Sequence, residues 1–299
     1  MTLTPADAPP VTSNGRISAW RLLLSNPVTV ASAVVLVVMV AVAILAPLLT
    51  PYPINAVNVP GALQPPSADH WFGTDELGRD IFSRILAAST VSLQVAVISV
   101  AFAFAVGVTL GILSGYYGGA LDTVLMRIVD VMFAFPVILL ALAIIAILGP
   151  GLATTMLAIG IVYTPIFARV ARASTMSVRV EPFVQVSKTM GTGDAFILRS
   201  HVLPNITGPL IVQTSLSLAF AILSEASLSF LGLGIQPPQP SWGRMLFEAQ
   251  AFIGQAWWMS IFPGAAIFVT VLAFNLFGDG LRDVLDPKQR SLMEARRRR

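Results

Sequence analysis

The sequence is poor in the residue types from which most catalytic and metal sites are built. Its 299 residues include no cysteine, two histidines (His70 and His201) and two lysines (Lys188 and Lys288). The absence of cysteine excludes disulfides and thiolate-bound metals, and two histidines far apart in sequence argue against an imidazole metal cluster. The G-x-x-x-x-G-K-[ST] phosphate loop, the H-E-x-x-H zinc pair and the G-x-S-x-G elbow are also missing. Any work that this protein does must therefore draw on an ion gradient or on a partner.

Charged residues are scarce and apolar residues are abundant. Only 11% of the residues are charged, 56% are hydrophobic and the mean hydropathy is +0.80, whereas roughly 25% charged residues would be ordinary for a soluble domain. A bilayer-spanning helix needs roughly 17–25 apolar residues. Six runs approach or exceed that length: Val28–Leu49, Val91–Leu113, Val124–Leu148, Leu152–Val170, Pro209–Leu231 and Trp258–Phe277. The sequence therefore predicts an all-α membrane protein with six transmembrane helices.

The basic residues are divided unevenly between the two sides that six spans define. Fifteen of the eighteen Lys and Arg fall in the terminal tails and the connections on their side, and three, Arg79, Arg84 and Arg244, fall on the other. Cytoplasmic loops carry the excess of Lys and Arg. We therefore expect both termini and the 181–205 connection to be cytoplasmic. The first apolar run is too long for a secretory signal peptide, so we expect it to be retained.

Composition suggests four segments along the chain. We expect residues 1–20 to be a disordered cytoplasmic tail, and 21–87 to hold the first transmembrane helix and an outer amphipathic helix. Residues 88–287 would be the main transmembrane domain, and 288–299 a basic cytoplasmic tail. The four arginines at the end, Arg296–Arg299, are typical of binding to anionic lipid headgroups rather than to nucleic acid.

The outer amphipathic helix is predicted from the end of the first outer loop. After the cap residues Thr74 and Asp75, the apolar residues Leu77, Ile81 and Ile85 recur on one helical face. The opposite face carries Arg79, Asp80, Ser83 and Arg84. We expect this helix to lie on the outer membrane surface. We interpret its charges as a solvated face, with contact to a substrate as the alternative.

Three ionisable residues fall at apolar depth, where burial of a charge costs about 2.5–3.5 kcal/mol. Arg127 and Asp130 are three residues apart and can pair on one helix face. Glu225 lies in a serine-rich stretch and should face the bundle interior, either hydrogen-bonded to serines or another subunit, or in contact with substrate. Pro136 and Pro263 invite helix bends. A small-residue stripe predicts close helix packing: Ala103, Gly107, Gly111 and Gly115.

The polar segment Glu181–Asn205 between two apolar runs has the pattern of two short helices. From Pro182, the apolar residues Phe183, Val186 and Met190 share one face until Gly191 ends the helix. Asp194 is the expected cap of a second helix that carries Phe196, Ile197 and Leu203 and ends at Pro204. A solvated linker would leave both apolar faces exposed. The pattern instead favours a rigid helical hairpin that docks into a partner's groove.

This segment resembles the cytoplasmic EAA loop of ABC-importer permeases. Gln185, Val186 and Ser187 stand where that pattern has Glu-Ala-Ala, and Gly191 is the motif glycine. Ile197, Leu203 and Pro204 approximate its I-x-x-x-x-L-P ending. Because Gln185 replaces an acid, a salt bridge made by that acid in the family is not expected here.

Three other segments resemble one branch, the C-type permease subunit of the dipeptide/oligopeptide/nickel importer family. These segments are the first helix region from Pro27 to Tyr52, the stretch HWFGTDELGRDIFSR, and Ser224–Gly243. The second stretch supplies the outer motif: Gly73, Thr74, Asp75, Gly78, Arg79, Asp80, Ser83 and Arg84. Ser89 and Thr90 depart from the Gly-Ala-Arg that usually follows it. The likeness runs from about Arg21 to Pro287.

The resemblance implies a type I ABC-importer permease that couples to ATPases through its EAA-like loop. Its partners would be a second, B-type permease subunit, two ABC ATPases, an extracytoplasmic substrate-binding protein and membrane lipids. ATP and Mg would be bound and used by the ATPases, so this chain would be non-catalytic and carry no cofactor. The coupling residues would be Glu181, Phe183, Gln185, Val186, Ser187, Gly191, Ile197, Leu203 and Pro204.

Two other classes of function fit parts of the sequence. An ion-coupled secondary transporter using Asp130 and Glu225 would be sensitive to uncouplers and independent of ATPases, but no inverted repeats are visible. An intramembrane enzyme would be active alone, but no nucleophile with a base or metal pair is visible. The cargo, whether dipeptide, longer peptide, glutathione-like compound or chelated metal, is not encoded in any motif.

Overall fold

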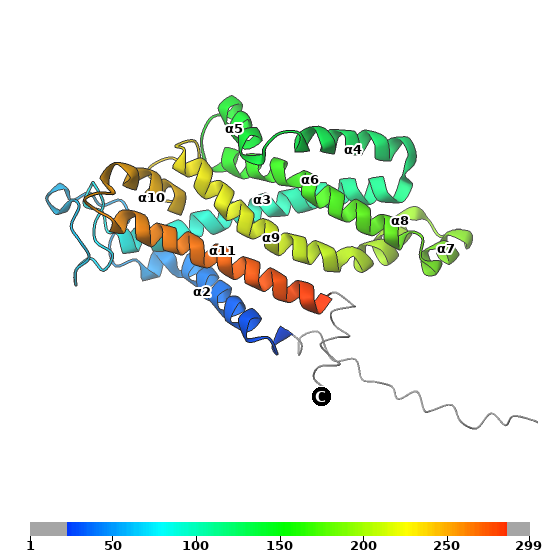
Figure 1. The fold of residues 1–299 in the computed structure, drawn as a ribbon, viewed down its shortest axis with the longest axis horizontal. Coiled ribbons are helices and arrows are strands. Elements are labelled where there is room, and N and C mark those ends of the chain that lie inside the picture. The colour runs from blue at the N-terminus through cyan, green and yellow to red at the C-terminus, as the bar shows by residue number, and fades with distance from the viewer. Residues whose placement is uncertain (1–22, 286–299) are drawn as a thin grey trace, which may run out of the picture.

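The computed structural model describes residues 23–285, so the predicted tails at 1–20 and 288–299 lie outside the described residues. The regular elements of the described part are helices. They are α2 (Pro27–Leu49), η1 (Val59–Gly61), α3 (Ile81–Tyr117), α4 (Gly119–Phe133), α5 (Val137–Leu148), α6 (Leu152–Val178), α7 (Pro182–Thr189), α8 (Asp194–Ile197), η2 (Leu198–Val202), α9 (Leu203–Phe230), α10 (Trp242–Ala249), η3 (Gln250–Phe252) and α11 (Trp258–Leu285). Figure 1 shows them as an elongated bundle.

Polar residues at the helix starts explain several of these boundaries. The Asn26 side chain accepts hydrogen bonds from the first backbone N–H groups of α2, where Pro27 has no N–H to satisfy. Asp80 caps α3 by accepting from the Ser83 N–H at 2.8 Å, and Ser241 caps α10 by accepting from the Arg244 N–H at 3.1 Å. Each cap satisfies backbone donors that a helix end leaves free.

The transmembrane prediction is confirmed, with one span broken in the middle. Within residues 23–285, five continuous helical stretches are long and apolar enough to cross a membrane: Pro27–Leu49, Ile81–Tyr117, Leu152–Val178, Asp194–Phe230 and Trp258–Leu285. The sixth predicted run falls on the pair α4 and α5, which pass the same test of length and composition together and bend by 91° at a short break. Pro136 lies in that break, as expected from its lack of an N–H donor. Pro263, by contrast, lies inside an unbroken α11.

The predicted small-residue stripe of α3 packs against α6. A Cβ added at Gly107 would lie 2.5 Å from the Thr164 carbonyl oxygen, and one at Gly115 would lie 2.7 Å from that of Arg172. Gly111 is equally tight against Ala168. The two backbones therefore approach more closely than any side chain would permit, which is how membrane helices pack without a hydrophobic driving force.

Different structural elements lie at the two ends of the bundle. Figure 1 places α7 and α8 at one end, toward which α2 begins and α11 ends, and α10 with the loop after α2 at the other. The start of α2 and the end of α11 on the same side agree with an even number of spans.

The predicted outer surface helix is wrong. The helix begins at Ile81 and continues without a break to Tyr117, so residues 81–87 are the first turns of a transmembrane helix. The predicted boundary between residues 87 and 88 falls inside α3. Ile81 and Ile85 face the core, and the residues interpreted as a solvated face are buried as well: Arg79, Asp80, Ser83 and Arg84.

Candidate functional site

The first candidate site is the terminal hairpin, residues 182–202, made of α7, the turn at Gly191, α8 and the π-helical η2. Pro182 opens α7 after Glu181, whose side chain makes no capping hydrogen bond. Gly191 follows the end of α7 with φ of +78°, a left-handed backbone that favours glycine. The sequence therefore fixes both ends of α7 with residues suited to those positions.

The inner side of the terminal hairpin is packed. Val184 and Ile197 are buried, and the rings of Phe183 and Phe196 contact the His201 ring edge to face, with centroids 6.0 and 5.8 Å away. Ser187 lies 3.3 Å from His201 Nε2. Because α7 and η2 are joined by these contacts, the hairpin is a compact body rather than a loose connection.

The outer side of the terminal hairpin is apolar and exposed. Val186 is 56% exposed and Met190 is 79% exposed. Phe183 and Phe196 also present part of their rings. A patch of four large apolar side chains on a projecting pair of helices has the character of a docking surface.

The structure separates the predicted coupling residues into three groups. Val186 and Phe183 lie on the exposed side, Ile197 faces the interior, and Gln185 donates from Nε2 to the Arg179 carbonyl at 2.7 Å. The prediction that Pro204 ends the second helix is wrong. Leu203 and Pro204 are the first residues of α9, and the helix runs from Asp194 through η2 to Phe230. Proline is tolerated there because the preceding π-helical turn already changes the hydrogen-bond pattern.

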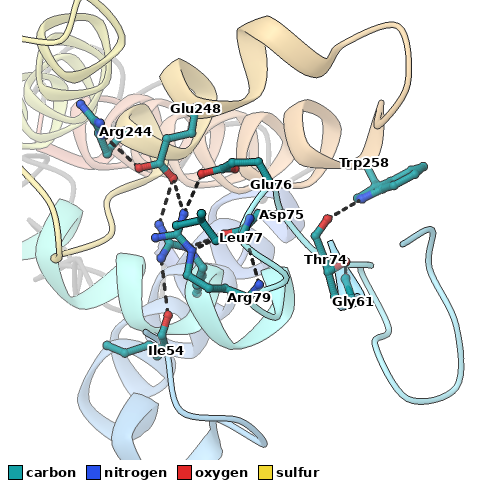
Figure 2. A network of polar contacts seen from close by, with 11 residues as sticks. Ile54, Gly61, Thr74, Asp75, Glu76, Leu77, Arg79, Arg244, Glu248 and Trp258 are labelled. Atoms are coloured by element: carbon teal, nitrogen blue, oxygen red, sulfur yellow. Dashed lines mark hydrogen bonds and ion pairs between the residues drawn. The ribbon is translucent and has the colours of Figure 1, made fainter. Parts of the chain in front are cut away.

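The second candidate site, at the opposite end, is the ionic cluster shown in Figure 2. Its members are Asp75, Glu76, Arg79, Arg84, Arg244 and Glu248. Asp75 accepts from the Arg79 backbone N–H at 2.9 Å and from its Nε at 2.6 Å, which closes a tight loop before α3. Gly78 sits inside that loop with φ of +74°, against the Asn58 carbonyl.

Glu248 joins the loop before α3 to α10. One of its oxygens lies 3.2 Å from an Arg79 nitrogen and 3.1 Å from an Arg84 nitrogen, and the other accepts from Arg244 Nε at 3.1 Å. Arg84 is 2% exposed and also donates to the Ile54 carbonyl at 3.4 Å. The charges that were predicted to face solvent are therefore paired in the interior, because their partner comes from a distant segment.

The ionic cluster contains three carboxylates and three guanidinium groups. Oxygens of Asp75, Glu76 and Glu248 lie within 4.8 Å of one another, a spacing that by itself resembles a cation site. The three arginines already neutralise these acids, so the donor set does not call for a metal. Burial and the neighbouring Asp75 carboxylate raise the pKa of Glu76 above its ordinary value of 4.5.

The remaining residues of the outer motif hold the loop before α3 in place. The Thr74 hydroxyl donates to the Gly61 carbonyl at 2.6 Å, and the Trp258 ring N–H donates to the Thr74 carbonyl at 3.1 Å (Figure 2). Gly73 has φ of +75° and lies against Trp258. Asp80 pairs with His70 at 2.9 Å, and the Ser83 hydroxyl accepts from the Tyr52 N–H at 3.2 Å.

The intramembrane polar residues occupy different environments. Glu225 is 0% exposed and accepts from the Ser92 hydroxyl at 3.2 Å and from the Ser229 hydroxyl at 2.7 Å. The predicted serine environment is confirmed. The predicted pair of Arg127 with Asp130 is wrong, because Asp130 binds Arg169 of α6 at 2.8 Å. Among the described residues, Arg127 has no ion-pair partner.

Comparison with known families identifies the kind of protein to which the terminal hairpin and the ionic cluster belong. Residues 107–291 match the family described as binding-protein-dependent transport system inner membrane component, and residues 17–66 match the N-terminal TM domain of oligopeptide transport permease C. The chain belongs to the binding-protein-dependent inner membrane permease family. It is therefore a multi-pass membrane permease of an ABC importer.

Several curated members of this permease family are similar over nearly the whole chain. The dipeptide transport system permease protein DppC of Alkalihalophilus pseudofirmus is 46% identical over 97% of both chains. The probable D,D-dipeptide transport system permease protein DdpC of Escherichia coli K12 is 46% identical over 92% of both. The glutathione transport system permease protein GsiD of Pectobacterium atrosepticum is 46% identical over 91% of both.

Solved structures of ABC transporters share the permease fold. An inward-facing conformation of the MetNI methionine ABC transporter covers 69% of this chain and 98% of its own, with a TM-score of 0.58 and 17% identity. At that identity the likeness shows the fold alone.

Several residues that shape the two ends of this permease were not identified from the sequence. Arg244 and Glu248 have opposite charge at an i, i+4 spacing on α10, a local signal that sequence reading can use. Asp122 of α4, which binds Arg172 of α6 at 2.6 Å and also contacts the Ser114 hydroxyl, has no such signal. Its partners are brought to it only by the fold.

Proposed function

We propose that this permease imports di- or oligopeptides in an ATP-driven complex in which the terminal hairpin is the docking site for the ATPases. The observation that carries the proposal is the exposed apolar side of the hairpin, where Phe183, Val186 and Met190 project from a body whose inner side is packed. An exposed apolar patch of this kind on a rigid support suits insertion into a groove of a partner protein.

The hairpin end would be cytoplasmic and the ionic cluster would lie outside. Arg79, Arg84 and Arg244, the three basic residues assigned to the outer side from the sequence, all belong to the ionic cluster at the end opposite the hairpin. The excess of Lys and Arg near the hairpin supports a cytoplasmic location for that end.

Membership of the family supports the remaining partners that we propose. The chain would pair with a second, B-type permease to complete a translocation path, and two ABC ATPases would bind the two hairpins, with ATP and Mg held by the ATPases. An extracytoplasmic binding protein would deliver the cargo. The dipeptide permeases among the similar proteins support peptides as the cargo class, and the glutathione permease extends that class to a modified tripeptide.

Movement of the hairpin by the ATPases would switch the bundle between outward- and inward-facing states. This chain's own residues would bind the ATPases, transmit their displacement and line half of the path. Membership of a family of transport permeases supports a non-catalytic role for this chain.

The test is to reconstitute the complex of both permeases and two ATPases in vesicles with the binding protein, and to measure uptake of radiolabelled dialanine and trialanine. Val186→Ser and Phe183→Ser should reduce both ATPase co-purification and uptake by about tenfold or more. The matched control is Ile253→Ser, which alters a similarly exposed apolar residue at the opposite end. Equal loss in the control and the hairpin variants would contradict the proposed docking site.

An uncoupler separates the proposal from ion-coupled transport through Asp130 and Glu225. Uptake that needs ATP and persists when the ion gradients are collapsed supports the proposal. Uptake that stops with the gradients and continues without ATPases would support secondary transport.

A further inference from the structure

The terminal hairpin is held to the bundle by a contact that its chain connections do not provide. Tyr116, in the last turn of α3, is 6% exposed and donates from its hydroxyl to Asp194 Oδ1 at 2.7 Å. Asp194 is the first residue of α8. The two residues are 78 positions apart in sequence, so this hydrogen bond exists only because the hairpin folds back onto α3.

The covalent connections of the hairpin lead to two other helices. α7 follows α6 after a short turn, and α8 continues through η2 into α9. Displacement of the hairpin is therefore passed to α6 and α9 by the chain itself. α3 has no covalent connection to the hairpin, so its direct contact with the hairpin is made by side chains.

Two further contacts surround the hydrogen bond. Arg179, which follows α6, donates to the carbonyls of Gly115 and Tyr116 at 3.0 and 3.2 Å and so satisfies the last turn of α3. Lys188 of α7 lies 5.4 Å from the centre of the Tyr116 ring. The Tyr116 side chain is thus enclosed by residues from both helices of the hairpin.

The hydrogen bond from Tyr116 is suited to transmit a displacement. A hydroxyl that donates to a carboxylate forms one of the stronger and more directional contacts in proteins. α3 has 37 residues and reaches from the hairpin end to the ionic cluster, where its first turns carry Arg84. A helix of that length spans about 55 Å and so joins the two ends of the bundle.

We propose that Tyr116 is a positioning residue of the transport cycle: its hydrogen bond to Asp194 ties the terminal hairpin to α3, so that the two move together when the ATPases close. This inference rests on the proposed function, because it assumes that ATPases displace the hairpin. The inference is that the Tyr116–Asp194 pair passes that displacement to α3.

The test compares variants of the pair in the same reconstituted complex. Tyr116→Phe keeps the ring packing and removes the hydroxyl, Asp194→Ala removes the acceptor, and Asp194→Asn keeps an acceptor oxygen. Tyr117→Phe is the matched control, because Tyr117 is 50% exposed and its hydroxyl makes no hydrogen bond to the described residues. Peptide uptake per ATP hydrolysed is the first readout.

We expect Tyr116→Phe and Asp194→Ala each to lower uptake per ATP by about tenfold or more, as for loss of a hydrogen bond to a charged group. ATPase co-purification should be unchanged. The double variant should be no worse than either single variant, because both remove one interaction. Asp194→Asn should retain most of the coupling, and Tyr117→Phe should match the wild type.

Hydrogen–deuterium exchange provides a readout that does not depend on the cargo. ATP should change exchange in both the hairpin and the last turns of α3 in the wild-type complex. In Tyr116→Phe the change should remain in the hairpin and disappear from α3. The inference is overturned if the change still reaches α3, or if the two single variants couple as well as the wild type. A different result is a wild-type complex that imports no peptide and still shows ATP-dependent exchange in both the hairpin and α3. That result would contradict peptides as the cargo and would still support the Tyr116–Asp194 contact as the link between the hairpin and α3.

Discussion

Glu248 lies within 3.2 Å of an Arg79 nitrogen and 3.1 Å of an Arg84 nitrogen, so one carboxylate oxygen is shared by two buried guanidinium groups. Glu248 belongs to α10, whereas Arg84 belongs to the start of α3 and Arg79 to the loop before it. The carboxylate therefore fixes the loop before α3 against α10 and gives that end of the permease a defined shape.

We expect Glu248→Gln to destabilise the protein by about 2–4 kcal/mol, because removal of one partner leaves buried charges uncompensated. The loss should appear as a lower thermal unfolding temperature in detergent, by roughly 2–4 °C for each kcal/mol. Asp130→Asn is the matched control, since its pair with Arg169 is half-exposed and should contribute about 1 kcal/mol or less. Similar shifts for the two variants would contradict the buried role of Glu248.

The raised pKa of Glu76 predicts a pH dependence of opposite sign to that of most carboxylates. Its folded-state pKa lies above the ordinary 4.5, through burial first and the Asp75 carboxylate second. The folded protein therefore binds this proton more tightly than the unfolded chain, and its stabilising contribution is lost as the pH rises from 4.5 through the raised value.

Glutamine cannot ionise, so Glu76→Gln should not lose stability as the pH rises through this range. We expect the variant to unfold at a higher temperature than the wild type at pH 7 and at nearly the same temperature at pH 4, because the raised pKa makes the ionised form the less stable one. Thermal unfolding in detergent between pH 4 and pH 8 tests this expectation. A variant less stable than the wild type across the whole range would show that the charged form of Glu76 is the stabilising one.

The membrane spans and the hairpin were predictable because their signals are local. Apolar runs, the glycine stripe of α3, the bend at Pro136 and the apolar face of Phe183 and Val186 are all readable within one helix length. Each reflects a rule that acts between residues three or four apart, or along one span.

The ionic cluster was not predictable because its partners are distant in sequence. Glu248 is 169 residues from Arg79 and 164 from Arg84. Helical periodicity alone assigns a charged face to solvent, and only the position of α10 shows that the face is covered. The Asp130–Arg169 and Tyr116–Asp194 contacts were missed for the same reason.

The approach of α3 to α6 can be tested at a single glycine. Gly111→Ala would place a Cβ against the Ala168 carbonyl oxygen, and overpacking of this kind costs about 1–3 kcal/mol. Gly264→Ala in α11 is the control, because nothing lies within 4 Å of the added Cβ. The thermal unfolding temperature should fall for Gly111→Ala and not for Gly264→Ala. An unchanged unfolding temperature for Gly111→Ala would mean that α3 and α6 can move apart without cost.

The turn of the terminal hairpin offers a second matched pair of glycines. Gly191 has φ of +78°, whereas Gly193 has φ of −65°, and both have open space around the added Cβ. Gly191→Ala should cost about 1–2 kcal/mol in local stability because only glycine adopts the left-handed backbone freely, while Gly193→Ala should be neutral or slightly stabilising. Hydrogen exchange of residues 182–202 measures this, and equal protection in both variants would contradict it.

Glu225 stabilises the C-terminal end of α9 through two serines whose hydroxyls bind backbone N–H groups of later residues. It accepts from Ser92 and Ser229, and these hydroxyls in turn accept from the N–H groups of Trp242 and Ile235 at 3.4 and 3.0 Å. Glu225→Leu should therefore cost about 2–4 kcal/mol, because it leaves buried hydroxyls without their acceptor. Glu225→Gln should cost about 1 kcal/mol or less, since an amide can replace the carboxylate as a partner for both serines.

The same two variants separate a structural carboxylate from a proton carrier. A structural Glu225 predicts that the Gln variant keeps ATP-dependent uptake near the wild-type rate, while the Leu variant loses uptake together with thermal stability. A carrier must release and bind a proton, which glutamine cannot do, so it predicts that the Gln variant folds normally and transports nothing. Uptake by Glu225→Gln at full thermal stability is the measurement that decides between them.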